Sequence, residues 1–339
     1  MDTWRACNHN LRMRRLVGGA TAVASSSARR RLSTLRASAG DRGELFIHPT
    51  AILEPGCRVG EHVHIGPYCV LGQHVTLADG VRLESHVRVA GHTTVGAGST
   101  LHAFSTVGAT PQDLKYEDEP SVLTLGERCR VAEYAHISGG TAAAGGGGTS
   151  IGDDCMIMSH CHVAHDCVLG ERVLLASSAA LAGHVHIGDG ARISGYSCVH
   201  QKVSIGRGAF LGGGSVLAHD LLPHGLAVGN RAHLLGLNLV GLRRRAVPPL
   251  ELRAMLAAYR YLFELPEQGF YKPLPLASLP TLHERAAACA AAPEYAAYPL
   301  LSEMNEFILG RRSVPPRSEH RTAVAESAPV SRRALCRPP

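Results

Sequence analysis

The central part of the sequence repeats every six residues. From Ile47 onward each six-residue block opens with isoleucine, leucine or valine, and this phase runs without a break to Val107. It returns at Leu125 and, after a second interruption, holds from Ile151 to Leu222. A fixed short period is typical of solenoids, in which each unit buries its apolar face against its neighbours. We therefore predict a solenoid of stacked short repeats.

Positions within the block also follow a pattern. The first residue is aliphatic, the second is often glycine, and the fifth is usually small, which favours short parallel strands joined by tight corners. Several cysteines occupy the fifth, inward position, and no CxxC motif occurs, so we interpret them as packing residues rather than metal or redox sites. They are Cys57, Cys69, Cys129, Cys155, Cys161 and Cys167.

This repeat resembles that of the hexapeptide-repeat family. The resemblance implies a left-handed parallel β-helix of triangular section, with three six-residue blocks per coil. The handedness comes from the resemblance alone, because ordinary parallel crossovers are right-handed. Blocks three apart then lie on the same face of neighbouring coils. This placement predicts His165, His184 and His200 on one face of three successive coils, with His162 at the corner that leads into the first.

His165 differs from most of the 20 histidines because Asp166 follows it directly. Many of the others occupy the outward fourth position of a block, where an imidazole is typically solvated. A neutral imidazole can take a proton from a hydroxyl group, and an adjacent carboxylate can hold its tautomer and support the imidazolium that forms. A backbone N–H group next to Gly183 is suited to stabilise an oxyanion.

The two ends of the chain differ in composition from the middle. Residues 1–42 contain nine arginines, no lysine and two aspartates, which is typical of an organelle transit peptide, with a disordered basic arm as the alternative. The dominance of arginine favours a mitochondrion over a plastid. Residues 311–339 are rich in proline, serine and arginine and are predicted to be disordered. No apolar stretch is long enough to span a bilayer, so we expect no stable membrane insertion.

Two insertions and a C-terminal segment complete the predicted organisation. The β-helix is predicted for residues 45–222, with loops at 109–122 and 138–150. Loops on a rigid scaffold often carry binding groups, although the second loop is nearly featureless in sequence. The segment "PPLELRAMLAAYRYLFEL" has helical spacing and is opened by proline. Together with two further helical segments, it predicts a small α-helical domain over residues 223–310.

Several motifs in this context resemble one particular family, the acyl-acyl carrier protein:UDP-N-acetylglucosamine O-acyltransferases, which catalyse the first step of lipid A biosynthesis. The resemblance covers residues 45–310, and its most specific motifs are "QDLKY" and "HVAHDCVLG". The other matching segments are "HPTAI", "GHTTVG", "LAGHV", "VHQ", "GN" at Gly229 and "GLRRR". By this resemblance, the chain is expected to transfer a (3R)-hydroxyacyl group from acyl carrier protein to the 3-hydroxyl of UDP-N-acetylglucosamine.

The resemblance also implies roles for individual residues. His165 is the expected general base that deprotonates the sugar hydroxyl, Asp166 orients it, and the Gly183 amide holds the oxyanion. Gly213 matches the position at which the family limits acyl length, so a glycine there implies room for a longer chain. The groups that line the substrate site are Asp113, Lys115, His162, His184 and His200. Those expected to meet the nucleotide or its phosphates are Gln201, Asn238, Arg244 and Arg245.

Three positions depart from the family pattern and bear on the nucleotide contacts. Ser138 stands where the bacterial pattern has histidine, Lys202 where it has an aromatic residue, and Val240 where it has glutamate.

The resemblance further implies a homotrimer with its sites between subunits, in which Lys115 of one copy meets His165 of the next. Acyl carrier proteins are acidic, and basic residues are suited to steer them. The candidates are Arg244, Arg245, Arg311 and Arg312. We expect no cofactor, no metal and no nucleic-acid partner.

Two alternatives remain open at this point. A γ-type carbonic anhydrase uses the same fold in organelles and holds zinc with three histidines from two subunits, so the histidine trio makes it a candidate. The "QDLKY" loop and the helical segment argue against it, because that family requires neither. A non-catalytic solenoid scaffold is the second alternative.

Overall fold

The computed structural model describes residues 44–141, 148–265, 279–310 and 335–338. The chain divides into a unit of residues 1–41 and a unit of residues 42–339, and every described residue belongs to the second. The predicted transit peptide, Arg311 and Arg312 lie outside the described residues. Within those residues, no helix is long and apolar enough to cross a membrane.

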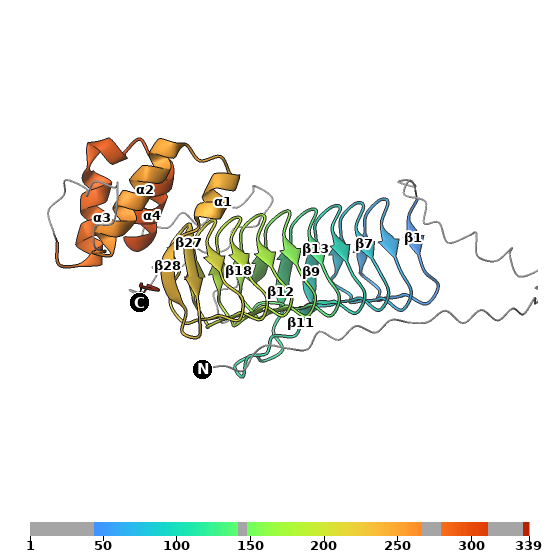
Figure 1. Ribbon diagram of the computed structural model, residues 1–339. Coiled ribbons are helices and arrows are strands. Elements are labelled where there is room, and N and C mark those ends of the chain that lie inside the picture. Colours follow the sequence, from blue (N-terminus) through green and yellow to red (C-terminus); the bar gives the residue numbers. More distant parts are fainter. Residues whose placement is uncertain (1–43, 142–147, 266–278, 311–334, 339) are drawn as a thin grey trace, which may run out of the picture. The chain divides into compact units, whose positions relative to one another are not determined.

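Short strands form three sheets whose members follow each other around a coil, as Figure 1 shows. The first sheet contains β1 (Phe46–Ile47), β4 (His64–Ile65), β7 (Arg82–Leu83), β10 (Thr100–Leu101), β13 (Arg130–Val131), β16 (Met156–Ile157), β19 (Leu174–Leu175), β22 (Arg192–Ile193), β25 (Phe210–Leu211), β27 (Gly225–Val228) and β28 (His233–Leu237). The second contains β2 (Ile52–Leu53), β5 (Val70–Leu71), β8 (Arg88–Val89), β11 (Thr106–Ala109), β14 (His136–Ser138), β17 (His162–Val163), β20 (Ala180–Leu181), β23 (Cys198–Val199) and β26 (Val216–Leu217). The third contains β3 (Arg58–Val59), β6 (Thr76–Leu77), β9 (His92–Val95), β12 (Val122–Leu125), β15 (Thr149–Ile151), β18 (Val168–Leu169), β21 (His186–Ile187) and β24 (Ser204–Ile205).

The strand register follows from the six-residue repeat. In the second sheet, His162 pairs with Ala180 and Val163 with Leu181, a step of one coil. The fourth residue of many blocks has a positive φ, as at Asp166 and His184 with φ of 58°, and this left-handed residue turns the chain into the next strand. The repeat therefore sets both the pairing of the strands and the position of each corner.

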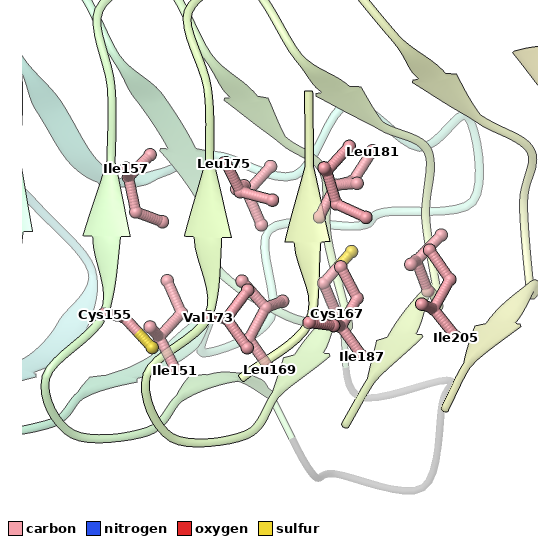
Figure 2. Close-up of a cluster of buried hydrophobic side chains, with 14 of the residues drawn as sticks. Ile151, Cys155, Ile157, Cys167, Leu169, Val173, Leu175, Leu181, Ile187 and Ile205 are labelled. Carbon is pink, nitrogen blue, oxygen red and sulfur yellow. The ribbon is translucent and has the colours of Figure 1, made fainter. Parts of the chain in front are cut away.

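The core is a column of inward-facing first and fifth residues. In Figure 2, Ile151, Leu169, Ile187 and Ile205 from successive coils form one row in this column. All but the first of the inward cysteines named above are buried, and they are free thiols. Burial raises the pKa of the Cys167 thiol to about 12, which keeps it protonated at neutral pH. This column stabilises the scaffold by burying apolar area along its whole length.

The helices follow the last coils. They are α1 (Leu239–Arg244), α2 (Pro249–Leu262), α3 (Leu282–Ala291), the 3₁₀ helix η3 (Pro293–Tyr295) and α4 (Pro299–Ile308). Helix α2 starts with proline in its first turn, and α3 starts with a capping box between Thr281 and Glu284.

The structure differs from the sequence prediction on either side of these helices. Strands β27 and β28 form an antiparallel pair where the helical segment was expected to begin, with Gly229 at φ of 104° between them. Residues 335–338, expected to be disordered, lie against the chain end of the solenoid: Leu335 bridges Asp220, and Cys336 is 1% exposed. The apolar pair Leu335–Cys336 explains this contact, since the rest of that tail has few groups to bury.

Candidate active site

His165 and Asp166 occupy the corner that follows β17. Asp166 is the left-handed residue of this corner, and its Oδ2 lies 2.8 Å from His165 Nδ1. The two residues are only 5% and 6% exposed. A buried hydrogen bond to a carboxylate fixes the imidazole tautomer, with the proton on Nδ1 and the lone pair on Nε2. Nε2 is thus the ring nitrogen of His165 that is left to accept a proton.

The environment of His165 Nε2 is formed by Gly183 and Asp113. A Cβ atom added at Gly183 would lie 2.6 Å from both Cε1 and Nε2 of His165, so only glycine fits at this position. Among the described residues, the Gly183 N–H has no hydrogen-bond acceptor, while its carbonyl accepts from the N–H of Lys202 at 2.9 Å. Asp113 Oδ2 lies 3.9 Å from Nε2. Gly183 and the Asp113 carboxylate therefore lie next to Nε2 of His165.

Asp113 reaches the site on the loop between β11 and β12, which leaves the stacked coils in Figure 1. Its side chain accepts from the Lys115 N–H at 3.1 Å, and its carbonyl accepts from the Tyr116 N–H at the same distance. This turn directs Asp113 towards His165 of its own chain and leaves Leu114 and Lys115 exposed. The predicted contact between Lys115 and His165 of another copy stays a prediction.

One further predicted histidine, His184, contacts this site, and a second, His162, lies near enough to His165 to interact with it electrostatically. The His184 ring lies edge-on to His165, with centroids 5.1 Å apart, and its Nε2 is 3.9 Å from Asp166 Oδ2. His162 stacks on His136 at 5.2 Å. Burial lowers the pKa of His184 and of His162, and for His162 the neighbouring His136 and His165 add to the effect. His184 and His162 are therefore neutral at neutral pH.

His200 and Gln201 lie one coil further along and are exposed. No hydrogen bond, ion pair or ring contact joins His200 to His165 or His184 within the described part of the chain. The three histidines predicted for one face therefore form a close pair and one separate residue. The reason is their position in the block, because His165 and His184 occupy corners whereas His200 directly follows a strand.

Gly213 lies at the corner before β26 and is exposed. An added Cβ would meet only the Gly195 carbonyl at 3.5 Å and Ser194 Cβ at 3.9 Å, which are ordinary contacts. Space around Gly213 is therefore open.

The predicted nucleotide residues lie around α1. Asn238 caps this helix: its side chain accepts from the Gly241 N–H at 2.9 Å and donates to the Gly208 carbonyl at 3.1 Å. Arg245 Nη2 donates to His224 Nδ1 at 2.8 Å. Arg244 and Val240 are exposed. Asn238 and Arg245 therefore have structural contacts of their own, which do not depend on a ligand.

His224 links Arg245 to helix α4. His224 is fully buried, and its Nε2 lies 3.3 Å from Glu303 Oε2. With Nδ1 accepting from Arg245, Nε2 carries the proton that Glu303 accepts. Burial lowers the pKa of both His224 and Arg245.

Sequence reasoning missed two threonines that contact Asp166. Thr141 donates its N–H to Asp166 Oδ1 and its hydroxyl to Oδ2, both at 2.9 Å, and Thr149 Oγ1 accepts the Asp166 N–H at 3.0 Å. Thr141 lies at the start of the glycine-rich insertion and Thr149 follows it as the first residue of β15. The sequence offers one signal for them, which is a threonine on each side of the alanine and glycine run.

Two groups of side chains in the described residues have a spacing that suits a metal ion. One is His165, Asp166 and His184, and the other is Glu84, His102 and Glu133 on the first-sheet side, each with potential ligand atoms within 4.8 Å of one another. The first offers two imidazoles and one carboxylate instead of the three histidines of a γ-type carbonic anhydrase.

A three-sided β-helix with a buried His–Asp pair at a corner defines this chain as a transferase of the hexapeptide-repeat class. Residues 148–183 match the family described as bacterial transferase hexapeptide (six repeats), and residues 220–314 match the second domain of UDP-N-acetylglucosamine O-acyltransferase. An acyl-(acyl-carrier-protein)–UDP-N-acetylglucosamine O-acyltransferase from Burkholderia lata is 51% identical over 218 residues, which are 64% of this chain and 83% of the relative. The Burkholderia thailandensis enzyme is 53% identical over the same share of both chains. The chain belongs to the UDP-N-acetylglucosamine O-acyltransferase family.

Solved structures agree with this assignment. The UDP-N-acetylglucosamine acyltransferase from Campylobacter jejuni superposes with a TM-score of 0.68 at 36% identity, covering 78% of this chain and 96% of that one. The Arabidopsis enzyme gives a TM-score of 0.66 at 32% identity, covering 83% of this chain and all of its own. These structures confirm the predicted fold class, a left-handed parallel β-helix followed by a few helices.

Proposed function

We propose that this protein transfers a (3R)-hydroxyacyl group from acyl carrier protein to the 3-hydroxyl of UDP-N-acetylglucosamine, the first step of lipid A biosynthesis. The observation that carries the proposal is the buried His165–Asp166 pair, whose open Nε2 faces Gly183 in a chain of this family. The activity named for the Burkholderia relatives supports the choice of donor and acceptor.

The geometry supports a general-base mechanism. His165 Nε2 takes the proton of the sugar 3-hydroxyl, and the oxygen attacks the thioester carbonyl to form a C–O bond and an oxyanion. Asp166, hydrogen-bonded at Nδ1, stabilises the imidazolium. When the oxyanion collapses, the C–S bond breaks. The thiolate of the carrier protein then leaves and receives the proton that Nε2 took from the sugar hydroxyl. Protons and charges balance, and no cofactor enters the scheme.

The unpaired Gly183 N–H is the donor proposed for the oxyanion. Gly183 is buried next to His165, so a single backbone donor from this residue acts in a poorly screened environment. Asp113 and His184 are proposed to contact the sugar because they border the same nitrogen.

Assembly as a homotrimer is part of the proposal. The tip of the 109–122 loop carries Leu114, which is 106% exposed, next to the exposed Lys115. Lys115 is then placed to reach the site of the neighbouring subunit, together with the exposed His200 and Gln201.

The remaining predicted residues are assigned to the nucleotide and to the acyl chain. Arg244 and Arg245 are proposed to bind the nucleotide phosphates, with Asn238 positioning this segment through its cap on α1. The open corner at Gly213 leaves room for the acyl chain. Val240 is exposed and stands where the bacterial pattern has an acidic residue. We therefore expect the contact with the uridine part of the nucleotide to differ.

We further propose that the protein acts in an organelle, with the mitochondrion favoured and the plastid as the alternative. The support is the arginine-rich composition of residues 1–42. The Arabidopsis enzyme shows that this enzyme class also occurs in a plant. Fluorescent fusions of residues 1–42 and of the chain from residue 43 test this directly: only the first should direct import, and a cytosolic fusion would contradict it.

The central test of the function uses protein that starts at residue 43. It is incubated with hydroxyacyl-acyl carrier protein and UDP-N-acetylglucosamine, the product is identified by mass spectrometry and NMR, and bound metals are measured. We expect a 3-O-hydroxyacyl product without stoichiometric metal. One zinc ion per site and no transfer would contradict the proposal and favour a metalloenzyme at His165, Asp166 and His184.

A further inference from the structure

We propose that Thr141 is a positioning residue for the His165–Asp166 pair. This inference rests on the proposed function, and it assigns a role to a segment that the sequence left without one. Three hydrogen bonds end on the Asp166 carboxylate, and their directions support this role.

The Asp166 carboxylate is held at both of its oxygens. Its Oδ2 receives His165 Nδ1 at 2.8 Å and the Thr141 hydroxyl at 2.9 Å, and its Oδ1 receives the Thr141 N–H at 2.9 Å. A single residue thus donates to both oxygens in the manner of a two-pronged clamp. Because both oxygens are engaged, the carboxylate cannot rotate without losing a hydrogen bond.

The backbone of Asp166 is held by Thr149, the first residue of β15. The Asp166 N–H donates to Thr149 Oγ1 at 3.0 Å, so the left-handed corner is held from the main chain as well. Thr141 and Thr149 are 4% and 1% exposed. Water therefore does not compete for these groups, and their hydrogen bonds are worth more than at a surface.

His184 competes with His165 for the Asp166 carboxylate. His184 Nε2 also lies 3.9 Å from Asp166 Oδ2, so a free carboxylate has two imidazoles within reach. The Thr141 bonds hold Oδ2 in line with His165 Nδ1. We infer that Thr141 determines which histidine becomes the base.

The glycines of the loop are required for this approach. A Cβ at Gly140 would lie 2.7 Å from Asp166 Oδ1 and would overlap the backbone of Gly148. Only glycine at position 140 lets the chain pass close enough for Thr141 to reach both oxygens. The glycine at position 140 therefore reflects a close backbone contact.

The experiment compares Thr141→Val, which keeps the shape and removes the hydroxyl, with Thr141→Ser, which keeps the hydroxyl. Thr124→Val in β12, outside the site, is the matched control. A hydrogen bond to a charged group corresponds to roughly a 10-fold change in rate. We expect Thr141→Val to lower kcat about 10-fold with little change in KM.

Thr141→Ser should restore kcat to within a small factor of wild type, and Thr124→Val should match wild type throughout. Equal kcat values for Thr141→Val and wild type, with His165→Ala inactive, would overturn the inference and leave the proposed function intact.

A readout that needs no substrate separates the two proposals. In protein labelled with ¹⁵N-histidine, the His165 Nδ1 proton, assigned by its loss in His165→Ala, should be protected from exchange in wild type and in Thr141→Ser. In Thr141→Val it should exchange faster or shift. If wild type transfers no acyl group but this pattern holds, the proposed function fails and the positioning role stands; an unchanged signal in folded Thr141→Val overturns the role.

Discussion

At the scale of single residues, the site depends on adjacent side chains that a strand would normally direct apart. His165 and Asp166 are consecutive, and they meet because Asp166 has a left-handed conformation at the corner. Gly183 in the next coil then leaves space beside Nε2. The same residues in a continuous strand would point to opposite faces.

Gly183→Ala is expected to abolish most activity without unfolding the protein. The new Cβ would lie 2.6 Å from His165 Nε2, so the imidazole must move away from its position. A displacement of about 1 Å at a reacting group can reduce the rate by about 100-fold. Steady-state kinetics and thermal melting check this; activity within a few-fold of wild type would show that Nε2 is not the reactive atom.

His224 gives a pH dependence to stability. Burial lowers its pKa below the ordinary value of 6.5, with Arg245 and Arg207 acting in the same direction and Glu303 opposing them. Well above pH 6.5, His224 is neutral in both the folded and the unfolded chain. As the pH falls below 6.5, His224 of the unfolded chain binds a proton, whereas His224 of the folded protein does not. The free energy of unfolding therefore decreases until the pH reaches the pKa of His224 in the folded protein.

His224→Gln is the matched variant, since its amide can accept from Arg245 and donate to Glu303 but does not titrate. Between pH 7 and pH 5, we expect the melting temperature to fall less steeply for His224→Gln than for wild type. Parallel curves for the two proteins would show that His224 does not contribute to the pH dependence.

At the scale of elements, the sequence predicted the strands and coil corners well because each six-residue block specifies its own geometry. Its aliphatic first residue and small fifth residue define what is buried. The β27–β28 pair was missed because it lies outside the repeat, and the Thr141 clamp was missed because a contact between residues 141 and 166 depends on the path of the loop. The contact of Asp113 with His165 of its own chain has the same origin. Periodicity predicts what repeats, whereas loop contacts depend on tertiary packing.

At the scale of the whole molecule, stability is expected to depend on register more than on length. Strands pair in steps of one coil, as His64 with Arg82 and Ile65 with Leu83, so removing a complete coil preserves the pattern. Deletion of residues 66–83 joins Ile65 to Glu84 and keeps the six-residue phase.

We expect this deletion to give a folded protein with a cooperative melting transition. Deletion of residues 66–74 shifts the phase by half a block and should not fold, because inward aliphatic residues become outward. Circular dichroism on heating distinguishes these outcomes. Similar behaviour of both deletions would contradict a scaffold defined by the repeat.

The most direct test of the account is the rate of acyl transfer to UDP-N-acetylglucosamine by His165→Ala. His160→Ala is the control, because His160 lies at the outward fourth position of its block and stacks only on Tyr134 in the described structure. Removal of the base is predicted to reduce kcat at least 100-fold, while His160→Ala stays close to wild type. Full activity in folded His165→Ala would contradict the assignment of His165 as the base.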